Sequence, residues 1–142
     1  MMDIVAAMRL YLLGEAAVTP LVGTRIYGPP GIPEDQTLQA MIRIDGPTGP
    51  GRGMYIPLNE PWVQLTCYGV TDLAAMQLYG VVSDALCRQG LKTFASVTAG
   101  KRAILYSAWE LMAPFPGHDI DTNWPFVFGR WATIWYEHEY PI

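Results

Sequence analysis

The run Leu-Val-Gly-Thr-Arg-Ile-Tyr at residues 21–27 constrains the fold of this chain more than any other segment. A helical pattern ends within it, and Gly23 can adopt the left-handed backbone conformation that ends helices. Ile26 and Tyr27 are β-branched and aromatic, so they favour the start of a strand. The run carries no catalytic group. It therefore predicts a change from helix to strand rather than a site of chemistry.

Helical patterns occur in two parts of the chain. Asp3 can cap a first helix that runs to about residue 13, and a short helical segment at residues 15–22 follows. The longest helix begins at residue 71 or 72 and ends near Gly90, which is its predicted C-cap. One stripe of this helix is predicted to face the core, and it contains Ala75, Leu78, Val82, Ala85 and Leu86.

Apolar patterns predict strands at residues 38–44, 62–68, 101–112 and 126–138. The strand at 101–112 is apolar on both faces, so we expect it to be central in a sheet. In the last strand Trp131 and Trp135 point to one side, while other apolar residues point to the opposite side. A strand that is apolar on both sides is expected to be covered on both sides, by helices or by another subunit.

Two long loops are predicted from glycine and proline content. Residues 46–53 contain Gly-Pro-Thr-Gly-Pro-Gly-Arg-Gly and lie between two strand patterns, which is typical of the tip of a long hairpin. Residues 113–125 form the second predicted loop. This order of elements predicts one α+β domain over residues 1–142. It has an antiparallel or mixed β-sheet, one long helix packed on a face of the sheet, and an N-terminal helix.

The composition favours contact with other protein surfaces. Charged residues make up 15% of the chain, against about 25% in typical globular domains, and hydrophobic residues make up 51%. This indicates a surface partly covered by copies of the chain or by partners, with a sparsely charged monomer as the alternative. The nine basic residues are scattered and the net charge is −4, so no footprint for nucleic acid is present. No signal peptide or membrane-spanning run is predicted.

The sequence contains no recognisable catalytic constellation. His118, Asp119 and Asp121 could hold a divalent ion, but a polar turn in which the aspartates bond the loop's own amides is the competing interpretation. Cys67 and Cys87 are predicted to be free, buried thiols. The serines lack a nucleophile motif, and residues 46–53 lack the Lys-Ser/Thr pair of a phosphate loop. We therefore predict no enzyme activity, no cofactor and no metal site.

The order of these features resembles the tail terminator (tail-completion) proteins of long-tailed bacteriophages. The most specific piece is Leu-Val-Gly-x-Arg-Ile-Tyr at residues 21–27. The resemblance covers nearly the whole chain: an opening amphipathic helix, residues 18–27 with the prolines that follow, an early strand, residues 63–68, the long helix, an acidic loop at 119–124 and a last strand at 130–136. The chain departs from the family pattern at 46–53 and in its longer loop at 113–125.

This resemblance implies a small α+β subunit that forms a homo-oligomeric ring, usually a hexamer. Such a ring caps the tail tube, stops its polymerisation and provides the docking surface for the head-side connector, or stopper, protein. The tail tube protein and the connector would be its partners, and DNA would pass through the ring without sequence-specific binding. The protein would be assembled in the host cytoplasm and located in the virion neck. Another neck, head–tail joining or minor tail protein is the nearest alternative, and a small-molecule or peptide-binding domain is the second.

Candidate contacts with partners are residues of the predicted hairpin and of the predicted loop at 113–125, which are expected to be exposed because loop backbone is not committed to a sheet. Mobile loop tips without a partner are the competing interpretation. The candidates are Arg52, Met54, Tyr55, Phe115, His118 and Trp124. Trp131 and Trp135 are predicted to belong either to the core or to a subunit interface.

Overall fold

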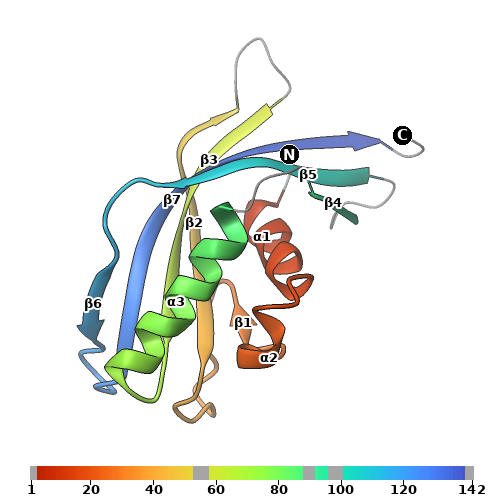
Figure 1. Ribbon diagram of the computed structural model, residues 1–142. Helices are drawn as coiled ribbons and strands as arrows, with labels where there is room; N and C mark the ends of the chain where they lie inside the picture. The colour runs from red at the N-terminus through yellow and green to blue at the C-terminus, as the bar shows by residue number, and fades with distance from the viewer. Residues whose placement is uncertain (1–2, 53–57, 88–91, 96–100, 140–142) are drawn as a thin grey trace.

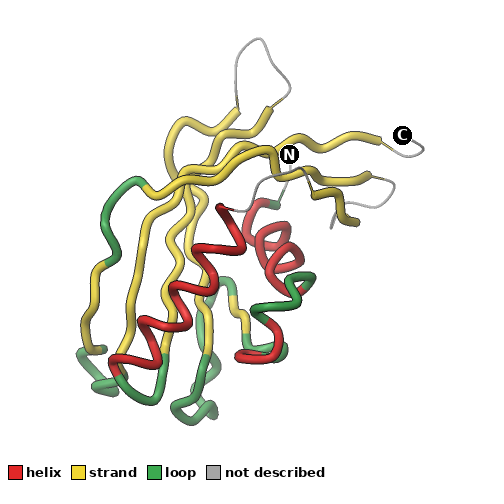
Figure 2. The backbone as a smooth tube through the Cα atoms, in the orientation of Figure 1, coloured by secondary structure: helices red, strands yellow, loops and turns green. Residues whose placement is uncertain are grey.

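The computed structural model describes residues 3–52, 58–87, 92–95 and 101–139 of the chain. It has an α+β fold in which the helices lie on one face of a seven-stranded mixed sheet (Figures 1 and 2). In chain order the elements are α1 (Ile4–Leu13), α2 (Thr19–Val22), β1 (Ile26–Tyr27), β2 (Met41–Arg52), β3 (Leu58–Tyr68), α3 (Asp72–Cys87), β4 (Lys92–Ala95), β5 (Lys101–Glu110), β6 (Phe115–His118) and β7 (Pro125–Glu139).

The sheet has the strand order β1-β2-β3-β7-β5-β4, and β6 also pairs with β7. Strand β1 pairs with β2 in parallel, and all the other pairs are antiparallel. Strands β5 and β6 share one edge of β7, because β5 pairs with its residues 131–139 and β6 with its residues 125–128. The long, regular strand β7 is therefore the centre of the sheet.

The turn at residues 21–27 joins the helices to the sheet as predicted, and its arginine holds it in place. Gly23 has a φ of 57°, but its ψ of −122° lies outside the left-handed helical region that we expected. That combination is open to glycine and strained for other residues. Arg25 Nε donates to the Ala40 carbonyl oxygen (3.0 Å), and its Nη2 donates to the Leu21 carbonyl oxygen (3.2 Å). These bonds tie the helix end and β1 to the start of β2, so this motif has a structural role in the subunit.

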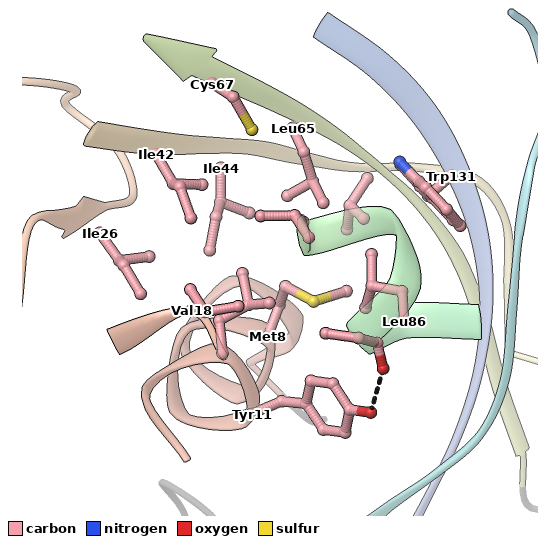
Figure 3. Close-up of a cluster of buried hydrophobic side chains, with 14 of the residues drawn as sticks. Met8, Tyr11, Val18, Ile26, Ile42, Ile44, Leu65, Cys67, Leu86 and Trp131 are labelled. Atoms are coloured by element: carbon pink, nitrogen blue, oxygen red, sulfur yellow. Dashed lines mark hydrogen bonds between the residues drawn. The ribbon is translucent and has the colours of Figure 1, made fainter. Parts of the chain in front are cut away.

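The core lies between the helices and the face of the sheet that they cover (Figure 3). Helix α1 begins as predicted, because Asp3 Oδ1 accepts a hydrogen bond from the Ala6 N–H (3.0 Å). Tyr11 of α1 donates its hydroxyl proton to the Ala85 carbonyl oxygen of α3 (2.9 Å), which links the two helices. The predicted stripe of α3 is confirmed, since all five of its residues are buried: Ala75, Leu78, Val82, Ala85 and Leu86.

Several predicted boundaries are wrong. The strand expected at 38–44 begins at Met41 and continues through the glycine- and proline-rich segment to Arg52. That segment is thus a strand with two register shifts against β3, not a loop, although the predicted β2–β3 hairpin is present. The loop expected at 113–125 contains β6. The predicted C-cap, Gly90, lies outside the described residues.

Strand β5 is an interior strand of the sheet, as expected from its two apolar faces. It lies between β7 and β4, but β4 pairs only with its residues 102–105. Tyr106 and Trp109 are exposed, so part of this strand is not covered within the subunit. The cause is topological, because α1 and α3 pack on the same face of the sheet and leave the other face without a helix (Figure 1). No helix in the described part of the chain has the length and apolar character needed to cross a membrane.

Candidate contact surface

The first group of candidate residues falls mostly outside the described part of the chain. Arg52 is the last residue of β2, and only its backbone is described. Met54 and Tyr55 lie outside the described residues. The prediction that these three residues contact a partner remains a prediction.

The second group does not form one surface. Phe115 and His118 lie at opposite ends of β6, and both are exposed. The β6–β7 register pairs Phe115 with Phe128 and His118 with Pro125, which places the two side chains on opposite faces of the sheet. His118 faces α3, where its Nε2 lies 2.7 Å from the Asp72 Oδ1 atom. His118 therefore ties β6 to the start of α3.

Trp124 is half-buried rather than exposed, so that part of the prediction is wrong. Its ring packs edge-on against Tyr68, with 6.1 Å between the ring centroids. Tyr68 in turn packs against Phe126 at the same centroid distance. Trp124 covers this end of the sheet within its own subunit.

The acidic loop after β6 is organised by its own hydrogen bonds. Asp119 Oδ1 accepts hydrogen bonds from the backbone N–H groups of Asp121 (2.9 Å) and Thr122 (3.0 Å). The bond from Thr122 is the main reason why the pKa of Asp119 is lowered. This is the polar turn that the sequence allowed as the alternative to a metal site. Among the described residues, no three His, Cys, Asp or Glu side chains are grouped to hold a metal ion.

The two thiols are free but differ in exposure. Cys67 is buried, and burial raises the pKa of its thiol, which suppresses the nucleophilic thiolate. Cys87 is exposed at the end of α3, so the expectation that both thiols are buried is wrong for this residue.

Trp131 and Trp135 belong to the core of the subunit. Both are fully buried on the helix-covered face of β7. Trp135 Nε1 donates to Thr133 Oγ1 (2.8 Å), whose hydroxyl donates to the Pro61 carbonyl oxygen (2.8 Å). Tyr11 packs edge-on against Trp135, with the ring centroids 6.5 Å apart. Of the two roles predicted for these tryptophans, the structure gives them the role in the core.

No helix of the described chain covers the opposite face of the sheet (Figure 1). The β3–β7 and β5–β7 registers place Trp62, Ala132 and Trp109 side by side in one row across three strands. Ala132 is buried in this row although no helix lies over it, because an indole flanks it on each side. Trp109 itself is 46% exposed.

The same registers extend this surface along β7. Even-numbered residues of β7 share the face of Ala132, because the pairing of β3 with β7 is regular from Asn59 to Tyr68. Phe115 of β6 packs against Phe128 on this face, with 5.3 Å between ring centroids, and is 53% exposed. We call this surface the open face and define it by Trp62, Trp109, Phe115, Phe128, Arg130 and Ile134.

Arg130 is the exposed cation of the open face. It lies opposite Gln64 of β3, one row from the two tryptophans. Its guanidinium makes no hydrogen bond or ion pair with a described residue. An unpaired arginine among tryptophan and phenylalanine is the composition that protein interfaces favour at their centres. The sequence signalled this surface through the apolar even positions of the last strand, but it did not show which face the helices leave open.

No protein-family model matches this chain, and no curated protein sequence aligns with it significantly.

Proposed function

We propose that this chain is a tail terminator of a long-tailed bacteriophage. Copies of the chain form a ring, usually a hexamer in the family it resembles, which caps the tail tube and stops its polymerisation. The far side of the ring is the docking surface for the connector. Assembly takes place in the host cytoplasm, and the protein ends in the virion neck.

The open face is the observation that carries this proposal. An exposed apolar surface of this kind on a small subunit favours contact with protein, because such a patch in water is unfavourable unless a partner covers it. The described side chains show bonds that hold the fold, such as those of His118, Asp119 and Arg25, rather than a group of reactive residues around a substrate. A ring that acts by shape needs an exposed apolar contact surface and does not need a group of reactive residues.

The charge of the chain supports the proposed passage of DNA. With a net charge of −4 and no cluster of basic residues, a ring of these subunits would not bind phosphate strongly. DNA would pass through its lumen without sequence-specific contacts. No cofactor is required for any of these steps.

The test is to polymerise the purified tail tube protein from the same genome with and without this chain. We expect tubes capped at one end by a ring in electron micrographs, and we expect capped ends to stop growing when more tube protein is added. The Trp109→Lys variant tests whether capping depends on the open face, because it places a charge there at an exposed side chain. This variant should fold but fail to cap the tube.

Tubes that grow to the same length with and without the chain, with no density at their ends, would refute the proposal. Density only on the connector and never on the tube would instead identify another neck or head–tail joining protein. A shift in melting temperature with a small ligand, without any assembly, would favour the binding-domain alternative.

A further inference from the structure

The outer surface of α3 is a second exposed apolar surface, distinct from the open face. Its exposed residues recur at helical spacing, and we call Leu73, Met76, Gly80 and Asp84 the outer stripe of α3. Leu73 is 66% exposed and Met76 is 42% exposed. Because α3 packs on the helix-covered face, the outer stripe and the open face point to opposite sides of the subunit (Figure 1).

Gly80 has no explanation within the subunit. It lies in the middle of α3, where glycine is unfavourable compared with alanine because its backbone is more flexible when unfolded. A Cβ atom at this position would have no atom within 4 Å, so packing inside the subunit does not exclude a side chain. A glycine that leaves a bare patch of helix between Met76 and Asp84 is suited to the close approach of a large side chain from outside.

Each of the two surfaces carries one exposed charged residue, and the two residues are opposite in sign. Asp84 is exposed and makes no hydrogen bond or ion pair with a described residue. The face of the sheet that contains the open face also carries Arg43 and Asp45, which form an ion pair with each other (3.2 Å), and the half-buried Glu60. Arg130 is its exposed cation. Asp84 of the outer stripe is therefore complementary in charge to Arg130 of the open face, and both surfaces also expose apolar side chains.

We propose that the outer stripe of α3 in one subunit docks on the open face of the next subunit, with an indole of the open face seated over Gly80 and Asp84 paired with Arg130. This inference rests on the proposed ring and names the two surfaces that close it. A contact between two different surfaces on opposite sides of the subunit is heterologous, so it repeats from copy to copy and closes into a ring when the rotation permits. A twofold contact between two open faces would instead leave both Asp84 side chains unused and bring like charges together.

The test is a charge exchange followed by the mass of the particle in solution. Arg130→Glu and Asp84→Arg should each shift the assembled protein to the mass of a single subunit. The double variant should recover the assembled mass, because the ion pair is restored with its partners exchanged. Asp35→Arg is the matched control, since it reverses an exposed aspartate outside both surfaces and should assemble normally.

A substitution at Gly80 tests the close approach without weakening the fold. Gly80→Gln should raise the melting temperature of the isolated subunit by roughly 2 °C, because glutamine favours a helix. The same variant should fail to assemble, because its side chain occupies the place of the neighbouring indole. Gly80→Gln is also introduced into the dissociated Arg130→Glu protein. The difference in melting temperature between these two proteins gives the effect of Gly80→Gln without assembly.

The outcomes separate this inference from the proposed function. If the unmodified chain forms rings on tube ends and all these variants do the same, the proposed docking is wrong and the tail terminator remains supported. If both single variants dissociate but the double variant does not recover, the pairing of Asp84 with Arg130 is wrong. If the unmodified chain stays a single subunit in the presence of tube ends, both proposals fail.

Discussion

Gly129 lies where α3 packs most closely on β7, and replacing it with alanine should destabilise the subunit strongly. A Cβ atom at this position would overlap the hydroxyl of Tyr79 and lie 2.8 Å from its Cζ atom. The Tyr79 ring is buried and cannot move away freely, because it packs against Trp131 with 6.5 Å between the ring centroids. The core must therefore shift to admit a single methyl group.

The expected loss for Gly129→Ala is about 3 kcal/mol, the upper end of the cost of inserting one methyl group into a packed core. For a chain of this length that loss lowers the melting temperature by roughly 10 °C. Gly14→Ala is the matched control, because the nearest atom to its added Cβ is a carbonyl oxygen at 3.5 Å and Gly14 has a negative φ of −83°. This control should lose no stability.

Tyr79→Phe should rescue part of the loss. It removes the overlapping hydroxyl, which is buried without a hydrogen bond of regular geometry to any described residue, so the single change should cost little. A double-mutant cycle measured by urea unfolding at one protein concentration should give a coupling of about 1–2 kcal/mol between the two positions. A Gly129→Ala protein within 0.5 kcal/mol of the unmodified chain, or a coupling of zero, would refute this account of the packing.

Three further predictions follow from single side chains. Asp3→Ala should lower the free energy of unfolding by about 1 kcal/mol in chemical denaturation, because the first turn of α1 loses its cap; no change would mean that the cap contributes nothing. Cys87 should react with a thiol reagent in the native protein, while Cys67 should react only on unfolding; equal rates would contradict the burial of Cys67. Burial raises the pKa of Tyr79 to about 12. Unfolded tyrosine ionises near pH 10, so the stabilising effect of the neutral form is complete below about pH 10 and is lost as the pH rises toward 12. Between pH 10 and pH 12 the free energy of unfolding should therefore fall less steeply for Tyr79→Phe than for the unmodified chain. Identical slopes for the two proteins would contradict the raised pKa of Tyr79.

The sequence predicted the elements whose local pattern agrees with their final environment. Residues 63–67 alternate between apolar and polar side chains, and Val63, Leu65 and Cys67 all belong to the buried core cluster. Thr66 and Tyr68 of β3 are buried as well. The core stripe of α3 and the cap at Asp3 were also predicted from local sequence patterns, and the structure confirms both. Each of these predictions needed only the spacing of residues within one element.

Other features depend on what lies opposite in space. Residues 46–52 are rich in glycine and proline, yet they form part of β2 because β3 extends far enough to pair with them through two register shifts. Phe-Pro-Gly-His has little strand propensity, but it becomes β6 because it lies along residues of β7 that β5 leaves free. Propensity alone cannot reveal a neighbouring strand.

The position of the open face also could not be predicted from local sequence patterns. Alternation along β7 separates Trp131 from Arg130 in sequence terms, but it does not say which side the helices cover. That choice follows from α1 and α3 packing on the same face (Figure 1). The loops that the sequence favoured for partner contacts include Trp124, which the fold uses to cover Tyr68. The open face can be identified only from the structure, which shows the face of the sheet that α1 and α3 cover.

We propose that the open face is a site of contact between copies of this chain, and the mass of the particle that the chain forms on tail tube ends shows whether such a contact exists. Native mass measurement of the isolated cap complex should give one ring containing several copies of the chain, and the Arg130→Glu protein should give no such ring. A single bound copy, or a ring that persists unchanged with a reversed charge on the open face, would contradict the account.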